Sequence, residues 1–350
     1  MSLGVIPAPI IQAPMAGVQD AGLAIAAAQA GAVGSLPAAM LGADALAREL
    51  ARLASEAGGP CNVNFFCHAP PAPDPARDAA WRAALRRFYD ELGLDPAPAA
   101  GAAASRQPFS DALAEVLEAN PPAVVSFHFG LPAPALLARV KRLGVAVWSS
   151  ATTLREALWL QAHGADAVIA QGLQAGGHRG HFLDTDPALQ LPTLALLQVL
   201  MPALMPTQMP ALRLPVIAAG GMVTADDVRA ARSLGAAAVQ AGTAYLLCPE
   251  AQTSAVHRAA LQDPAARSAL TKLFSGGLAR GLENRLMREL GPVNALAPAF
   301  PGAAAALAPL RARAEAAGRG DFSPLWAGEA WRACRAMSAA EVTQALAAGL

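Results

Sequence analysis

Eight short apolar segments, separated by stretches of helical character, constrain the fold of this chain more than any other feature. Each is bounded by glycine, proline or a polar residue, and they lie at 10–13, 32–36, 61–66, 123–127, 145–149, 167–170, 216–219 and 237–240. Strands that alternate with helices form parallel sheets, and nearly continuous apolar strands fit a sheet that is buried on both faces. Because a closed (β/α)8 barrel needs eight such units, the sequence predicts an α/β fold of the TIM-barrel type.

Three regions exceed what a minimal barrel requires. Residues 68–108 are rich in alanine and proline, residues 181–210 combine a proline-rich loop with a leucine-rich stretch, and residues 250–350 read as helices without a clear strand. Insertions at the carboxyl ends of barrel strands usually build the substrate pocket. We therefore expect a barrel over residues 1–249 with two insertions. A mainly helical region over 250–350 should complete the barrel edge and cover the site as a lid or substrate domain.

Composition limits the classes of function. Of the 350 residues, 54% are hydrophobic and 15% are charged, which is enough apolar material for a large core, and the formal net charge is zero. A neutral chain gives no indication of a nucleic-acid or anionic-membrane partner. Residues 21–41 carry no charge, but Gln29, Gly31, Gly34 and Pro37 interrupt them, so a packed helix leading into a buried strand fits better than a membrane span.

Two further features bear on location and metal binding. Residues 1–9 lack the pattern of a secretory signal, so we expect a soluble, cytoplasmic protein. The four cysteines show neither a close pair nor a zinc spacing, and Cys67-His68 is the one tempting metal pair. We interpret them as thiols in a reducing compartment and expect no metal site.

The most informative local stretch is residues 171–180, Gln-Gly-Leu-Gln-Ala-Gly-Gly-His-Arg-Gly, which follows the sixth apolar segment. A strand that ends in a glycine loop with a titratable residue is how parallel α/β enzymes expose catalytic groups. His178, between glycines, is therefore the candidate catalytic residue, with His181 as the alternative. His128 ends the fourth segment, where it is as compatible with the core as with the pocket.

Glycine-rich turns end the seventh and eighth segments, at 219–221 and 240–243. In barrels these two loops and an adjacent helix N-terminus commonly bind phosphate, because exposed amides and the helix dipole attract anions. Thr224 and Asp227 predict a capping box at the start of that helix. The glycines alone would also fit tight turns, but two such turns on adjacent strands favour a phosphorylated ligand.

Small and amide side chains mark the ends of other segments. The turn after the first segment, 12–17, carries Met15, which would suit a flat ring across the barrel mouth or simply fill the barrel top. Alternation places Asn62 and Asn64 on one face of the third strand, and Gln171 is a similar inward amide on the sixth. An inward amide in an apolar barrel requires a hydrogen-bonding partner.

Five motifs together resemble the nitronate monooxygenase family, formerly called 2-nitropropane dioxygenases. They are residues 12–18, 62–66, 126–130, 171–180 and 218–221, in the family's order, and the resemblance runs from about residue 9 to 290. It implies a barrel with an added helical domain and non-covalently bound FMN. The implied reaction is the oxidation of alkyl nitronates by dioxygen to a carbonyl compound and nitrite, with a small-molecule substrate as partner.

The resemblance also implies roles for individual residues. His178 corresponds to the active-site histidine, which contacts the nitronate or removes the α-proton of a neutral nitroalkane. The implied cofactor contacts are Pro14, Met15 and Ala16 beside the isoalloxazine ring, Asn64, Gln171, Gly176 and Gly177, and, at the phosphate end, Gly220, Gly221, Gln240, Ala241, Gly242 and Thr243. The chain departs from the family pattern at Gln174, where glutamate is usual, and at Phe300 and Ala304, where close relatives carry polar side chains.

The sequence is also compatible with functions other than nitronate oxidation. An FMN-dependent reductase fed by NADH or NADPH, acting on an enoyl thioester or a quinone, would use the same fold, and Arg280, Arg285 and Arg288 would then be the candidates for a docking patch. The simpler interpretation of these arginines is a solvated or salt-bridged face of a helix over 282–290. A non-catalytic flavin-binding protein is a third possibility. A homodimer is compatible with all three.

Overall fold

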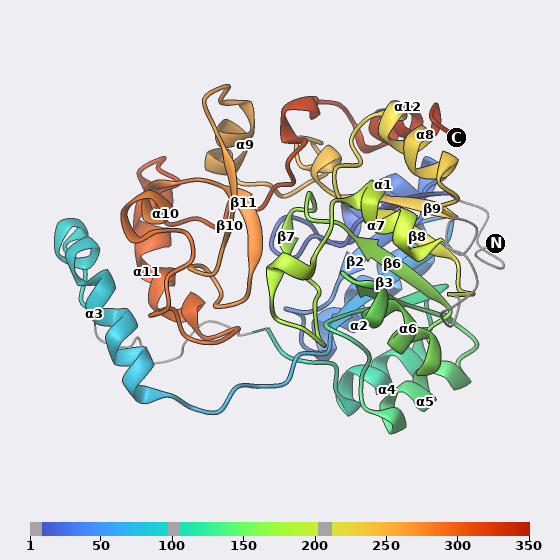
Figure 1. Ribbon diagram of the computed structural model, residues 1–350, viewed down its shortest axis with the longest axis horizontal. Coiled ribbons are helices and arrows are strands. Elements are labelled where there is room, and N and C mark those ends of the chain that lie inside the picture. Colours follow the sequence, from blue (N-terminus) through green and yellow to red (C-terminus); the bar gives the residue numbers. More distant parts are fainter. Residues whose placement is uncertain (1–8, 97–105, 202–211) are drawn as a thin grey trace.

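The structure is a computed structural model that describes residues 9–96, 106–201 and 212–350. Its strands and helices alternate through the first two thirds of the chain (Figure 1). The strands are β1 (Ile10–Gln12), β2 (Gly34–Pro37), β3 (Cys61–Phe66), β4 (Val124–His128), β5 (Ala146–Ala151), β6 (Ala167–Gln171), β7 (Gly177–His178), β8 (Val216–Ala219), β9 (Ala238–Ala241), β10 (Ser268–Thr271) and β11 (Ala279–Leu282). The helices are α1 (Ala21–Gln29), α2 (Ala43–Glu56), α3 (Pro75–Leu92), α4 (Asp111–Ala119), α5 (Pro134–Arg142), α6 (Leu154–Ala162), α7 (Thr193–Leu200), α8 (Ala225–Ser233), α9 (Ala255–Gln262), α10 (Arg285–Leu290), α11 (Ala303–Ala316) and α12 (Ala339–Ala347).

Eight parallel strands form the barrel, in the order β1-β9-β8-β6-β5-β4-β3-β2. A parallel bridge between Ile11 and Val33 closes the ring, since the Gln12 amide donates to the Val33 carbonyl and the Val33 amide donates to the Ile10 carbonyl, each at 2.9 Å. Each predicted apolar segment overlaps one of these strands, with bounds that agree within two residues. The predicted TIM-barrel fold is therefore confirmed.

The strands are buried on both faces, as expected for a parallel sheet covered by helices. On β6, Ala167 and Ile169 pack in one apolar cluster with Ile217 of β8, whereas Val168 belongs to a second cluster that includes Leu196 of α7. The alternation follows from the two-residue period of a strand. One face fills the barrel interior and the other holds the surrounding helices, which leaves the strand ends as the place for a polar site.

A second unit lies beside the barrel (Figure 1). The long helix α3, from the predicted insertion at 68–108, packs against α11. The expectation that residues 250–350 contain no strand is wrong, because β10 and β11 form an antiparallel sheet with β7 in the order β10-β11-β7. These strands are only four residues long, and Arg280 and Gly281 interrupt the apolar pattern of β11. We propose that this unit is the lid of the barrel.

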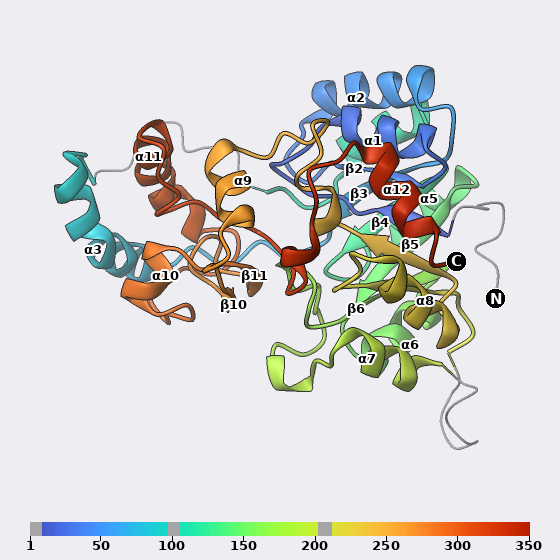
Figure 2. The same ribbon diagram turned by 90° about the horizontal axis from the view of Figure 1, so that it is seen from above.

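Two segments return to the barrel rather than to the second unit. The leucine-rich stretch of the 181–210 insertion forms α7, which packs against β6 and β8 and so belongs to the helical layer of the barrel. Residues 202–210 of that insertion, like 97–105 of the first, lie outside the described residues. The last helix, α12, packs against α1 and α8 (Figure 2). The end of the C-terminal region thus packs on the helical layer of the barrel.

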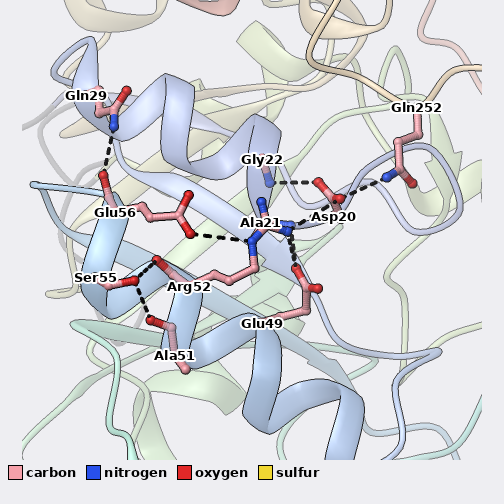
Figure 3. Close-up of polar contacts among 10 residues, drawn as sticks. All are labelled: Asp20, Ala21, Gly22, Gln29, Glu49, Ala51, Arg52, Ser55, Glu56 and Gln252. Carbon is pink, nitrogen blue, oxygen red and sulfur yellow. Dashed lines mark hydrogen bonds and ion pairs between the residues drawn. The ribbon is translucent and has the colours of Figure 1, made fainter.

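The uncharged segment 21–41 folds into α1 and β2, as predicted. Its alanine-rich helix offers few side chains for capping, and neighbouring segments supply them (Figure 3). Asp20 accepts a hydrogen bond from the Gly22 amide at 2.7 Å, Glu49 of α2 accepts one from the Ala21 amide at 2.9 Å, and Gln252 donates to Asp20 at 2.9 Å. No helix in the described parts of the chain is long and apolar enough to cross a membrane.

Substitution of Asp20 tests this capping. We expect Asp20→Ala to lower the free energy of unfolding by about 1–2 kcal/mol, because the Gly22 amide at the helix start loses its partner. Asp44→Ala, an exposed acidic residue in the first turn of α2, is the matched control and should change it by less than about 0.5 kcal/mol. Urea denaturation followed by circular dichroism measures both. Equal effects of the two substitutions would contradict the capping role.

Candidate active site

A large cavity opens at the carboxyl ends of the barrel strands and holds about 1310 Å³ of empty space, including the part open to solvent. It extends from the barrel mouth to residues of the second unit, Trp326 and Gly328. All but one of the predicted site residues line it: Pro14, Met15, Ala16, Asn64, Gln171, Gly176, Gly177, His178, Gly220, Gly221, Gln240, Gly242 and Thr243. The exception is Ala241, which is 1% exposed and packs in the core instead. Its side chain points away because it follows Gln240 on the same strand.

The glycine turns after β8 and β9 form one side of the cavity. Gly220 has φ +113°, and a Cβ there would lie 2.8 Å from the backbone nitrogen of Ala175, so only glycine fits. The predicted capping box at α8 is confirmed, but its consequence differs from the expectation. The Thr224 hydroxyl already accepts from the Asp227 amide and the Asp227 carboxylate adds negative charge. An anion would therefore meet the amides of the glycine turns rather than the end of this helix.

The buried amide side chains hold neighbouring segments as well as facing the cavity. Asn64 donates to the hydroxyl of Ser126 on β4 at 2.9 Å, while Asn62 lies deeper, does not line the cavity, and donates to Ser35 at 3.0 Å. Gln240 lines the cavity, and its side-chain oxygen is buried without a hydrogen-bond partner. Since a buried acceptor without a donor is costly, this oxygen marks a position where a ligand N–H or O–H group fits.

Gln171 fixes the loop that carries His178. Its side-chain nitrogen donates to the His178 carbonyl at 2.9 Å, and its oxygen accepts from the Gly180 amide at 2.7 Å. The loop residues Gly177 and His178 also form β7, which pairs with Ala279 and Arg280 of β11. The backbone on which the imidazole is mounted is thus held from the barrel on one side and from the second unit on the other.

The imidazole of His178 lies in an aromatic environment. Its ring centroid is 5.1 Å from that of Phe300 and 5.5 Å from that of Trp326, and its Nε2 lies 2.8 Å from the hydroxyl of Ser275. Burial, followed by the positive charge of Arg106, holds the pKa of His178 well below its usual range. The ring is therefore neutral at physiological pH, and can accept a proton but carries no charge to attract an anion.

His128 lines the cavity and has a supporting position. Its Nε2 lies 3.2 Å from the His178 carbonyl, which can only accept, so Nε2 carries the hydrogen and Nδ1 accepts from the Ser150 hydroxyl at 2.6 Å. Burial lowers its pKa to about 4. His181, the alternative catalytic candidate, does not line the cavity; its Nδ1 lies 3.4 Å from Gln190.

Sequence reasoning missed several residues that the structure brings to the site. Ser275 and Trp326 come from the second unit, and no local motif marks them. Arg106 lines the cavity from the segment before α4, at the end of the insertion 68–108, where no motif marks it. Arg179 lies in the motif 171–180, yet the motif gives no indication of its role: its buried guanidinium donates to the carbonyls of Gln171 and Gly172, both at 2.8 Å.

Two of the three departures from the family pattern, Gln174 and Phe300, make contacts near the site. Gln174 accepts hydrogen bonds from the amide and the hydroxyl of Thr193, at 2.7 and 3.0 Å, so a neutral side chain serves as acceptor there. Phe300 belongs to the aromatic wall around His178. The predicted helix over 282–290 is shorter, because Leu282 ends β11. The salt-bridged interpretation holds for two arginines: Arg280 pairs with Glu329, and Arg285 pairs with both Glu91 and Glu289.

Fold and site together define a class: a (β/α)8-barrel enzyme whose cavity lies between the carboxyl ends of the strands and an added unit. The family model described as nitronate monooxygenase matches residues 2–349. The chain therefore belongs to the nitronate monooxygenase family, which is a family of oxidoreductases.

Individual relatives agree with this assignment. The nitronate monooxygenase of Pseudomonas aeruginosa is 41% identical over 97% of this chain and 95% of that protein. The nitronate monooxygenase of Paraburkholderia phytofirmans is 37% identical over 97% of this chain and 92% of that protein. Among solved structures, nitroalkane oxidase from Streptomyces ansochromogenes has a TM-score of 0.86 and 37% identity over 99% of this chain and 96% of that chain. FabK from Thermotoga maritima, with a TM-score of 0.70 and 23% identity over 99% of this chain and 93% of that chain, shares the fold.

The low pKa of His128 predicts a pH dependence of stability. The unfolded chain binds a proton on this histidine near pH 6.5, whereas the folded protein does so only near pH 4, so stability falls as the pH falls through this window. We expect the free energy of unfolding to drop by about 2 kcal/mol from this group between pH 7 and pH 5. His128→Asn should remove this contribution to the drop in the free energy of unfolding between pH 7 and pH 5. His163→Asn, at an exposed histidine, should leave the drop unchanged. Urea denaturation at both pH values measures this drop. A drop in His128→Asn as large as in the unmodified protein would refute the lowered pKa of His128.

Proposed function

We propose that this protein oxidises alkyl nitronates with dioxygen to a carbonyl compound and nitrite, using FMN bound in the barrel mouth. Membership of the nitronate monooxygenase family and relatives named as nitronate monooxygenases support the reaction class. The observation that carries the proposal in this chain is the placement of His178. A neutral imidazole on a doubly anchored loop lines a cavity that the glycine turns after β8 and β9 also line.

The residues of the cavity fit a flavin nucleotide. The oxygen of Gln240 lacks a donor, and Gly220 and Gly221, both with positive φ, leave backbone amides uncovered by side chains. Polar groups that converge in an otherwise apolar cavity are typical of cofactor sites. We propose that Gly220, Gly221, Gln240, Gly242 and Thr243 hold the phosphate end.

The ring end of the cofactor would lie against smaller and amide residues. We propose Pro14, Met15, Ala16, Asn64, Gln171, Gly176 and Gly177 as its contacts. FMN, when bound, would supply the redox chemistry, taking electrons from the nitronate and passing them to dioxygen. The protein contributes orientation and electrostatics. The side-chain amides of Asn64 and Gln171 have fixed orientations toward the cofactor site, because both are already hydrogen-bonded to neighbouring segments.

His178 would have one of two roles, according to the substrate that enters. A nitronate arrives without its α-proton, and the imidazole then positions it. A neutral nitroalkane must first lose that proton, and the neutral imidazole can accept it. Ser275, 2.8 Å from Nε2, is a positioning residue because it fixes the orientation of the ring. Because its pKa is held well below the usual range, the imidazole is in the proton-accepting form throughout the physiological pH range.

We also propose a cytoplasmic location. All four cysteines are free. Burial raises the pKa of the Cys61 thiol to about 11 and that of Cys248 and of Cys334 to about 12, so these thiols remain protonated and unreactive. Free, inert thiols fit a reducing compartment.

The proposed reaction is tested first with the FMN-loaded protein under anaerobic conditions. We expect propyl nitronate alone to change the visible absorption of the flavin rapidly, and admission of air to restore it with release of nitrite. His178→Ala should lower kcat/KM for the neutral nitroalkane by about 10²- to 10⁴-fold, and less for the preformed nitronate. Rapid bleaching by NADH or NADPH alone, with no response to nitronate, would move the assignment to a reductase. Bound FMN without any turnover would indicate a binding protein.

Substitution of a cavity glycine tests the cofactor site separately from turnover. We expect Gly220→Ala to raise the Kd for FMN at least about tenfold, because the added Cβ meets backbone at 2.8 Å and disturbs the turn. Gly144→Ala, at an exposed glycine with φ +73° and open space around it, carries the same kind of backbone strain far from the cavity and should leave the Kd unchanged. Quenching of free flavin fluorescence measures both. Equal Kd values for Gly220→Ala and the unmodified protein would refute the site.

A further inference from the structure

Arg106 is fixed at the rim of the barrel. The segment that carries it runs beside the end of β3, where Phe66 bridges to Pro108 and the Phe109 amide donates to the Phe66 carbonyl at 2.8 Å. The Gln107 amide donates to the Ala39 carbonyl at 3.3 Å, so the segment is also attached to the end of β2. From this position the side chain of Arg106 lines the cavity.

The guanidinium is the one permanent charge in the described wall of the cavity. No aspartate, glutamate or lysine lines it, and the lining histidines, His128 and His178, are neutral because burial lowers the pKa of each. An arginine stays protonated in proteins even when burial lowers its pKa, as it does for Arg106. The cavity therefore has a net positive potential that comes from a single residue.

Among the described residues, this charge has no ion-pair partner. The Nε of Arg106 is buried and makes no hydrogen bond, and no carboxylate within the described residues forms an ion pair with the side chain. A largely buried cation without a counter-charge is destabilising, and a bound anion would relieve that cost. The charge also reaches His178, since Arg106 is the largest electrostatic cause of its lowered pKa after burial.

The aromatic side chains around His178 cannot provide such a contact. Phe66, Phe300 and Trp326 surround the His178 ring with centroid distances of 6.1, 5.1 and 5.5 Å. Apolar rings bind the alkyl part of a substrate but offer nothing to its charge. A ligand with an apolar tail and an anionic head is thus oriented by this cavity, with the head toward Arg106.

We infer that Arg106 is the residue that selects anionic substrates, by binding the two oxygens of a planar nitronate through its guanidinium fork. The inference rests on the proposed function for the identity of the substrate. The chemical class that the site accepts is a small organic anion whose charge is shared by two oxygens on one planar centre, which the planar fork of arginine matches. The neutral nitroalkane lacks this charge and would gain little binding energy from Arg106.

Two substitutions and two readouts test the inference. In the FMN-loaded protein, we expect Arg106→Gln to raise KM for propyl nitronate about 10- to 100-fold with a smaller change in kcat, and to leave KM for the neutral nitroalkane within about threefold. Arg106→Lys keeps the charge without the fork and should be intermediate. Arg48→Gln, which removes an exposed charge from α2, should change neither KM.

Equilibrium binding of nitrate, a planar anion that undergoes no turnover, separates this inference from the proposed reaction. We expect isothermal titration calorimetry to show nitrate binding to the FMN-loaded protein and at least about tenfold weaker binding to Arg106→Gln. Nitrate binding lost in the variant would support the anion site even if no nitronate is oxidised. An unchanged nitrate Kd would overturn the inference, as would a raised Kd for FMN in Arg106→Gln, since Arg106 would then hold the cofactor.

A third measurement tests whether the guanidinium of Arg106 lies close enough to His178 to affect its pKa. Removal of the guanidinium should raise the pKa of His178 toward its usual value, because one cause of the lowering is lost. Nuclear magnetic resonance titration of the His178 ring in Arg106→Gln and Arg48→Gln measures this shift. A pKa of His178 that is the same in both variants would show that Arg106 does not face the catalytic ring, and would also overturn the inference.

Discussion

The guanidinium of Arg179 is the contact on which the active-site loop depends. It is fully buried and donates to three acceptors, the carbonyls of Gln171 and Gly172 at the end of β6 and the side-chain oxygen of Gln190. Burial lowers its pKa to about 9, so it remains charged at neutral pH. Because the planar guanidinium binds several oxygen acceptors at once, it keeps the loop over residues 172–180 close to the end of β6. His178 directly precedes Arg179 in the chain, so this contact also restricts the position of His178.

The second anchor of the loop is the three-stranded sheet of the added unit. β7 is only two residues long and has no stability as a strand without β11 beside it. The same unit contributes Ser275 and Trp326, so part of the surroundings of His178 comes from residues far downstream in the chain. The added unit thus does more than lie beside the barrel, since its residues hold the His178 ring in place.

Electrostatics divides the cavity into parts. The glycine turns after β8 and β9 provide backbone dipoles, and the aromatic wall provides no charge. Both histidines are kept neutral by burial, which leaves Arg106 as the source of positive potential. In a cavity of low polarity a single unpaired charge acts at longer range than it would in water. This arrangement allows one side chain to decide the sign of the charge that enters.

The sequence alone determined the barrel, because eight apolar segments bounded by glycine and proline leave few alternatives to a closed parallel sheet. It also located His178 and the two glycine turns, since these features lie within a few residues of a strand end. It could not place Arg106, Ser275 or Trp326, which reach the cavity through contacts between distant segments. Nor could it separate Ala241 from its neighbours or decide the position of His128. Tertiary structure decided these points, because side-chain direction, burial and pKa depend on what packs against a residue and not on its neighbours in the chain.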